Sequence, residues 1–134
     1  VYGVSGPDAA RILQTLSIRG RFEIVDALPG VIFLIDYAHN GLSLTSALRV
    51  LREYHPHRLI CLFGSVGCRT KYLLFDDRED ALRAAVQMAE NGDIVLCAGK
   101  GHETYQLING EKVPFSEREI ILHEAALRLE SLPI

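Results

Sequence analysis

The sequence has 134 residues, of which 49% are hydrophobic and 23% charged, and its formal net charge is −3 at pH 7. This length and composition are typical of one folded domain with its own core, and they exclude a disordered or collagen-like chain. The charge offers no basic surface for a nucleic-acid backbone, and no apolar run approaches the ~18 residues of a membrane helix, so we expect neither nucleic acid nor a membrane as a partner.

The first predicted elements are a short helix and a hairpin. Pro7 suits the first turn of a helix that ends near Leu16. The sequence does not begin with Met, so we expect residues 1–19 to be the end of a preceding domain or a linker, and residues 20–134 to be the domain itself. In "RFEIVDALPGVIFLID" (21–36), Pro-Gly joins two apolar runs and is too short for a crossover, which predicts an antiparallel hairpin.

Helix and strand patterns then alternate. Apolar side chains at i, i+3, i+4 and i+7 predict an amphipathic helix over residues 41–54. "RLICLF" (58–63) is uninterrupted after its arginine, which predicts a strand covered by helices on both faces, and "YLLF" (72–75) is a weaker strand signal. Helical spacing resumes after Asp76 and Asp77, either of which can cap the next helix.

The last third of the chain predicts a strand, a hairpin and a helix. "GDIVLCAGKG" (92–101) is a buried strand pattern ending in glycines, Asn-Gly in "YQLINGEKVPF" (105–115) is a hairpin signal, and "SERE" (116–119) is a capping box. The whole order predicts an α/β fold with a mixed, mostly parallel sheet, an antiparallel N-terminal hairpin and helices on both faces. Because such sheets bind ligands at the carboxyl ends of their strands, three segments are candidates for the site.

The first segment is "DYAHN" (36–40). Asp36, His39 and Asn40 supply an acceptor, a titratable group and an amide donor at the end of a buried strand, which suits a hydroxylated and phosphorylated ligand such as a nucleotide. The alternative is a well-made strand-to-helix turn in which Asn40 only caps the following helix.

The second segment is "GSVGCRT" (64–70). It fails both the P-loop and the GxGxxG patterns, and a Gly-x-x-Gly pair is more often a tight turn than a binding site. Arg69 can hold a carboxylate or phosphate in a bidentate grip, although a solvated surface arginine is the commoner case.

The third segment is "AGKGHE" (98–103). Its glycines let a ligand approach the backbone, and Glu103 can accept a hydrogen bond from an ammonium group. Arg69 and Glu103 in neighbouring loops would make a pocket for a zwitterion, each recognising one end of an amino acid.

We expect no metal site in this chain. His39 and His102 each lack a second His or Cys at ligand spacing, and His55 and His57 precede the strand at 58–63 and therefore lie at its opposite end. The three cysteines also lack ligand spacing, and two lie in apolar runs, which fits a reducing cytoplasm.

In order, these segments resemble the C-terminal domain of the Mur ligases, and among them the members that add the third amino acid of the peptidoglycan peptide. The resemblance covers nearly the whole chain. The motifs that carry it are "GRFE" (20–23), "DYAHN" (36–40), "FGSVGCR" (63–69), "DDRE" (76–79) and "GDIVLCAGKGHETYQ" (92–106).

The resemblance implies a Rossmann-like fold and an ATP-dependent amide ligase. Such an enzyme joins diaminopimelate or lysine to UDP-MurNAc-L-Ala-D-Glu through an acyl phosphate, with Mg²⁺ neutralising the phosphates. The ATP loop and the magnesium ligands belong to the preceding domain, so the resemblance implies that this chain works with its own N-terminal and central domains and is inactive alone. No residue here is an evident general base.

The resemblance also implies roles for individual residues. Arg21, Asp36, His39 and Asn40 would line the nucleotide side of the cleft. Arg69, Gly99 and Glu103 would hold the amino acid.

Two departures from the family pattern stand out. Ser65, Val66 and Cys68 replace much of a glycine-rich loop, while Arg69 is kept. Between Lys71 and Tyr72 the family carries a long additional segment that selects the amino acid. The eight residues 64–71, which lie between the apolar runs at 58–63 and 72–75, are also too few for a crossover between parallel strands. We therefore expect a segment to be missing between Lys71 and Tyr72. Two alternatives stay open: a folylpolyglutamate- or cyanophycin-type ligase domain, and a non-catalytic nucleotide-binding module.

Overall fold

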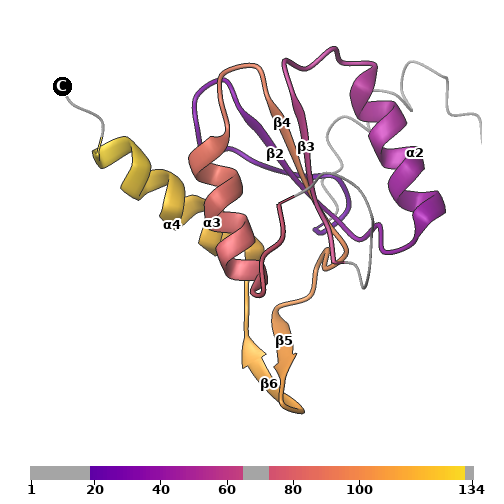
Figure 1. Cartoon of the computed structure of the whole chain (residues 1–134), viewed down its shortest axis with the longest axis vertical. Helices are drawn as coiled ribbons and strands as arrows, with labels where there is room; N and C mark the ends of the chain where they lie inside the picture. The colour runs from indigo at the N-terminus through magenta and orange to yellow at the C-terminus, as the bar shows by residue number, and fades with distance from the viewer. Residues whose placement is uncertain (1–18, 65–72, 132–134) are drawn as a thin grey trace, which may run out of the picture.

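The computed structural model describes residues 19–64 and 73–131 of the chain (Figure 1). The predicted helix near residues 7–16, Arg69 and the junction of Lys71 with Tyr72 lie outside the described residues. The elements are β1 (Glu23–Val25), β2 (Ile32–Asp36), α2 (Gly41–Arg52), β3 (Leu59–Leu62), α3 (Arg78–Met88), β4 (Ile94–Ala98), β5 (Tyr105–Ile108), β6 (Glu111–Pro114) and α4 (Glu117–Glu130).

The main sheet is mixed, as predicted. Its strand order is β1-β2-β4-β3, with β1 antiparallel to β2 and with β4 parallel to both β2 and β3. The strands β5 and β6 form a separate antiparallel hairpin, in which Asn109 and Gly110 take the positive φ angles of 51° and 84° that a tight turn requires. This hairpin projects from the end of the molecule at which β4 ends (Figure 1).

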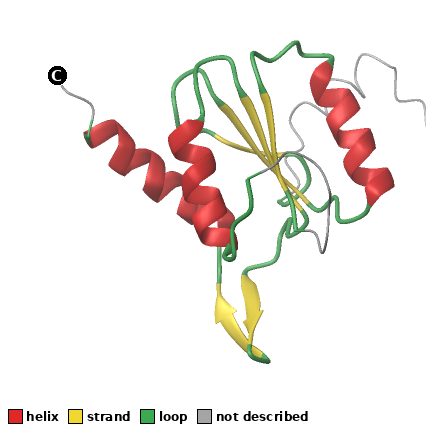
Figure 2. Cartoon of the chain, in the orientation of Figure 1, coloured by secondary structure: helices red, strands yellow, loops and turns green. Residues whose placement is uncertain are grey.

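Helices cover both faces of the sheet, which confirms the predicted architecture (Figure 2). Alternate residues of each strand point to opposite faces. Phe33, Ile35 and Val95 pack with Leu82, Val86 and Ile121 from α3 and α4. On the other face, Leu34 and Leu96 pack against Ala47 and Leu51 of α2.

Each helix begins at a side-chain cap that the sequence predicts. Asn40 accepts a hydrogen bond from the Ser43 backbone in a full capping box, Asp77 accepts one from Glu79, and Ser116 accepts one from Glu119. These contacts satisfy backbone donors that the first turn of a helix leaves without partners.

Of two predictions about the middle of the chain, one is confirmed and one is wrong. The strand within 58–63 forms as β3 and is packed on both faces, with Ile60 and Leu62 against the core of α3 and α4 and Leu59 and Cys61 against that of α2. It pairs with β4 alone among the described residues and is only half-buried. Residues 73–75 of the predicted second strand are not in a strand, and Leu73 and Leu74 are exposed. An apolar run alone does not tell whether a partner strand exists.

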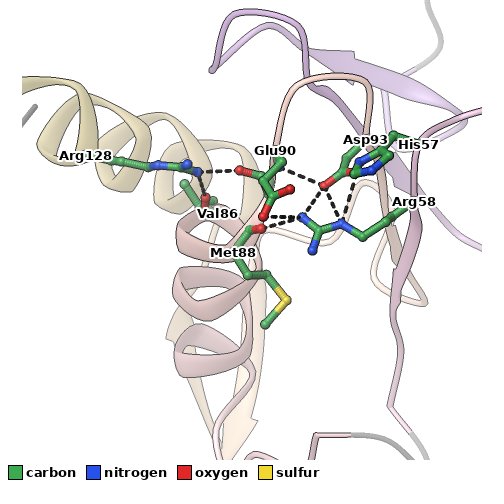
Figure 3. Close-up of polar contacts among 8 residues, drawn as sticks. His57, Arg58, Val86, Met88, Glu90, Asp93 and Arg128 are labelled. Carbon is green, nitrogen blue, oxygen red and sulfur yellow. Dashed lines mark hydrogen bonds and ion pairs between the residues drawn. The ribbon is translucent and has the colours of Figure 1, made fainter.

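The amino ends of β3 and β4 are joined to the end of α3 by an ion-pair cluster (Figure 3). Asp93 is 1% exposed and accepts hydrogen bonds from the Arg58 guanidinium at 2.6 Å and from the Glu90 backbone at 2.8 Å. Arg58 also donates to the carbonyl of Met88 at 2.7 Å. None of the helices within the described residues is long and apolar enough to span a membrane.

Candidate functional site

Three of the sequence segments singled out above meet at the carboxyl ends of β2 and β4. These are residues 20–23, 36–40 and 99–103. Gly20 packs so closely on the third segment that a Cβ there would lie 2.1 Å from the backbone nitrogen of His102, and a Cβ on Gly101 would lie 2.8 Å from the Cβ of Tyr37. Both glycines have positive φ angles, so each is required by space and by backbone conformation.

Asp36 ties these segments together. Its carboxylate accepts hydrogen bonds from the backbone of Phe22 at 3.0 Å and of Ala38 at 2.8 Å, and its carbonyl accepts one from the Gly99 backbone at 2.9 Å. The residue is 6% exposed. Asp36 therefore holds the neighbouring backbone in place and offers little surface of its own.

The side chains of Tyr37, His39, His102 and Arg21 form a surface where these three segments meet. The Tyr37 ring centroid is 4.9 Å from that of His39 and 5.6 Å from that of His102. The Arg21 guanidinium lies 5.1 Å from the Tyr37 centroid. Arg21, His39 and His102 are exposed, so this surface can stack on a planar group and pair with an anion.

The 99–103 segment leaves its backbone accessible. Gly99 has φ of 112°, which favours glycine, and among the described residues no heavy atom outside its chain neighbours lies within 4 Å of the position that a Cβ would take. The Glu103 carboxylate is 37% exposed and lies 3.6 Å from the Lys100 ammonium. A ligand can thus reach the Gly99 backbone, with a carboxylate acceptor nearby.

Of the residues predicted for the site, Arg21, Asp36, His39, Asn40, Gly99 and Glu103 lie in these three segments. Asn40 caps α2, as the alternative interpretation predicts, with its amide exposed. Arg69 lies outside the described residues. Sequence reasoning missed Tyr37, whose signal was its place between Asp36 and His39, and it missed the buried pair of Arg78 and Glu117.

The described residues contain neither a reactive cysteine nor a group of metal ligands. Burial raises the pKa of Cys61 to about 11 and also raises that of Cys97, which keeps both thiols protonated and unreactive. No three His, Cys, Asp or Glu side chains gather as metal ligands within residues 19–64 and 73–131.

A separate apolar groove of about 610 Å³ lies between β3 and α3. It is lined by Ile60, Leu62, Leu74 and Met88 among others, and by no residue of the three segments above. The groove lies beside β3, which is an edge strand of the sheet within the described residues.

Residues 20–72 match the family described as Mur ligase, glutamate ligase domain. Several curated relatives bear the name UDP-N-acetylmuramoyl-L-alanyl-D-glutamate--2,6-diaminopimelate ligase. That of Caldanaerobacter subterraneus is 29% identical over 81% of this chain and 32% of its own length. That of Bradyrhizobium diazoefficiens is 30% identical over 93% and 35%, and that of Coxiella burnetii is 32% identical over 79% and 31%. The chain spans about a third of the length of these relatives.

The alignments are longer than the part of the chain that they cover. The Caldanaerobacter alignment runs over 155 positions, whereas 81% of 134 residues is about 109, so about 46 positions have no counterpart in this chain. The Bradyrhizobium alignment runs over 171 positions and covers 93% of the chain, about 125 residues, which again leaves about 46.

A solved structure, also titled UDP-N-acetylmuramoyl-L-alanyl-D-glutamate--2,6-diaminopimelate ligase, shares the fold. It superposes with a TM-score of 0.70 and 23% identity, covering 85% of this chain and 33% of that one. The family match, the curated relatives and the fold agree with the motifs described above. The chain belongs to the family of Mur ligase C-terminal domains.

Proposed function

We propose that the chain is the C-terminal domain of an ATP-dependent, ADP-forming ligase that adds the third amino acid to UDP-MurNAc-L-Ala-D-Glu in peptidoglycan synthesis. The names of the relatives favour 2,6-diaminopimelate over lysine as that amino acid. We place the protein in the cytoplasm, and we propose that its partners are its own N-terminal and central domains.

The observation that carries this proposal is the meeting of the three segments at the carboxyl ends of β2 and β4. An accessible glycine backbone and Glu103 lie on one segment, and an exposed arginine lies over a tyrosine ring close by. Together they offer an acceptor for an ammonium group next to a surface suited to a nucleotide. Positioning an amine against an activated carboxylate accounts for much of the catalysis in such a reaction.

The residues fit ATP on one side of the junction. Arg21 can pair with a phosphate, Tyr37 can stack on a base, and His39 and Asn40 present polar groups beside them. ATP supplies the phosphoryl group that activates the carboxylate of the other substrate. No group of metal ligands forms within the described residues, so we propose that Mg²⁺ is held mainly by the central domain.

On the other side, Glu103 would accept from the ammonium group of the amino acid, and the open backbone at Gly99 would admit it. Arg69 would pair with its carboxylate. Because the ATP loop is expected in the preceding domain, the isolated chain should form no ADP.

We also propose that residues 20–134 form the domain and that it continues, between Lys71 and Tyr72, into a segment that this sequence lacks. The surplus of about 46 aligned positions in the relatives supports this. The end of the family match at residue 72 supports its place.

Glu103→Ala in the full-length protein tests the assignment of the amino-acid side. We expect the KM for diaminopimelate to rise about tenfold or more, because an ammonium group loses a charged acceptor. The KM for ATP should change less than about twofold, a shift too small to reflect a lost charged hydrogen bond. Both constants come from ADP release measured with each substrate varied in turn.

Glu111→Ala is the matched control, because Glu111 is an exposed glutamate on the nearby β6 strand. It should leave both constants unchanged. Equal effects of Glu103→Ala on both KM values would overturn the assignment of Glu103. Nucleotide binding without any ADP formation by the wild type would instead indicate a binding module.

A further inference from the structure

A buried ion pair lies directly behind the 99–103 segment. Arg78 is the first residue of α3 and Glu117 is the first residue of α4, so the pair joins the starts of two helices. The Arg78 guanidinium donates to Oε1 of Glu117 at 2.6 Å, and the two side chains are 16% and 2% exposed. Burial of this kind costs free energy that an exposed ion pair does not.

Arg78 also contacts the backbone of the candidate site. Its Nη2 donates to the carbonyl oxygen of Ala98 at 2.8 Å. That oxygen belongs to the peptide unit between Ala98 and Gly99, whose nitrogen donates to the carbonyl of Asp36 at 2.9 Å. One peptide unit is therefore held from both sides, by β2 and by Arg78.

Arg78 contacts Ala98 at the point where β4 no longer has β3 as a neighbouring strand. The register of β3 with β4 ends at the pair of Leu62 and Cys97, one residue before Ala98. Arg78 thus takes the place of a strand neighbour. Since Gly99 has a φ of 112° and no side chain, a fixed peptide before it determines where its backbone points.

Glu117 uses only one of its two carboxylate oxygens, Oε1, in the pairing with Arg78. Its Oε2 is buried and accepts no hydrogen bond from the described residues. Burial raises the pKa of Glu117, while the charges of Arg78 and Lys100 oppose that rise. Lys100 lies in the 99–103 segment and donates to the carbonyl of Tyr105 at 3.0 Å.

We propose that Arg78 and Glu117 are positioning residues, which fix the Ala98–Gly99 peptide and so hold the 99–103 segment in the shape that binds the amino acid. Neither residue contacts the substrate. The inference rests on the proposed function for its kinetic consequence, but not for its structural one.

The test compares two ion pairs in the full-length protein. Arg83 and Glu124 also join α3 to α4, at 2.9 Å, but their hydrogen bonds go to each other, to Glu79 and to Gln87, and not to the Ala98–Gly99 peptide. Arg78→Met should raise the KM for diaminopimelate about tenfold, as expected for the loss of a charge-assisted hydrogen bond that orders the site, with the KM for ATP nearly unchanged. Arg83→Met should leave both constants as they are.

Arg78→Lys adds a conservative variant. Lysine keeps the charge but lacks the planar fork that binds Glu117 and Ala98 together, so the KM for diaminopimelate should lie between those of wild type and Arg78→Met. If Arg78→Met and Arg83→Met affect the KM for diaminopimelate equally, the pair is merely structural and the proposal fails.

Amide hydrogen exchange separates this proposal from the proposed function. In the same proteins, Arg78→Met should speed exchange of the Gly99 amide about tenfold or more, whereas Arg83→Met should not, because of these two arginines only Arg78 donates a hydrogen bond to that peptide. Unchanged exchange at Gly99 overturns the proposal whatever the protein catalyses. Faster exchange without any diaminopimelate ligation in the wild type overturns the proposed function alone.

Discussion

Asn40 has two possible roles that single substitutions can separate. Its Oδ1 accepts from the Ser43 backbone at 2.9 Å and caps α2, and its exposed amide lies in the segment that we assign to the nucleotide. Asn40→Ala should lower the free energy of unfolding by about 1 kcal/mol, the usual loss for a helix cap. Asn40→Asp keeps an acceptor at a helix N-terminus, so urea denaturation should show a change below about 0.5 kcal/mol.

The kinetic measurement then isolates the second role. Asn40→Asp loses the amide donor and adds a negative charge, so in the full-length protein the KM for ATP should rise about tenfold. Asp77→Ala is the control, because it removes the cap of α3 and should cost about 1 kcal/mol without changing that KM. A normal KM for ATP in a stable Asn40→Asp protein would leave Asn40 as a helix cap alone.

Among the elements, β3, α3 and β4 are joined by the Asp93 cluster (Figure 3). The hydrogen bond from Arg58 is the main reason that the pKa of Asp93 falls from 3.8 to about 2, against the opposing effect of burial. A carboxyl group whose pKa is lower in the folded state stabilises the fold above its unfolded pKa. Its contribution is lost as the pH falls from about 4 to about 2.

Asp93→Asn should therefore destabilise the protein at pH 6 by about 1.5–3 kcal/mol, the range for a hydrogen bond to a charged group. The difference in unfolding free energy between wild type and Asp93→Asn should shrink as the pH is lowered from 5 to 3. Urea denaturation at several pH values measures it. A difference that stays constant over this range would show that the Asp93 charge does not stabilise the fold.

The sequence predicted individual helices and strands better than it predicted which strands lie side by side. Strand β4 and helix α2 follow from apolar periodicity, and the caps at Asn40 and Ser116 follow from local chemistry. The open edge at β3 could not be predicted, because a run of apolar residues reports contact with helices and not the presence of a partner strand.

The site was predicted to the level of segments and not of contacts. The rule that ligands bind at the carboxyl ends of strands located residues 36–40 and 99–103. It could not show that the Asp36 carboxylate is used by backbone amides. Nor could it pair Arg78 with Glu117, which lie 39 positions apart and meet only after α3 and α4 have packed.

At the scale of the whole molecule, the edge strand β3 of the described sheet and the aligned positions that the relatives have in excess point to the same part of the chain, just after β3. The groove of about 610 Å³ lies between β3 and α3. Beside it Leu73 is 68% exposed and Leu74 is 78% exposed. About 46 aligned positions of the relatives have no counterpart in this chain. Gly64 and Leu73, the described residues on either side of the expected junction, both line this groove.

Inserting the corresponding segment of the Bradyrhizobium relative between Lys71 and Tyr72 should therefore stabilise the protein. Covering the groove removes apolar side chains from water, and each fully buried one contributes about 1.5–3 kcal/mol. The midpoint of thermal unfolding should rise by at least about 5 °C. A glycine-serine insert of equal length adds only loop entropy and should lower the midpoint. If both inserts lower it alike, the groove is not where the missing segment packs.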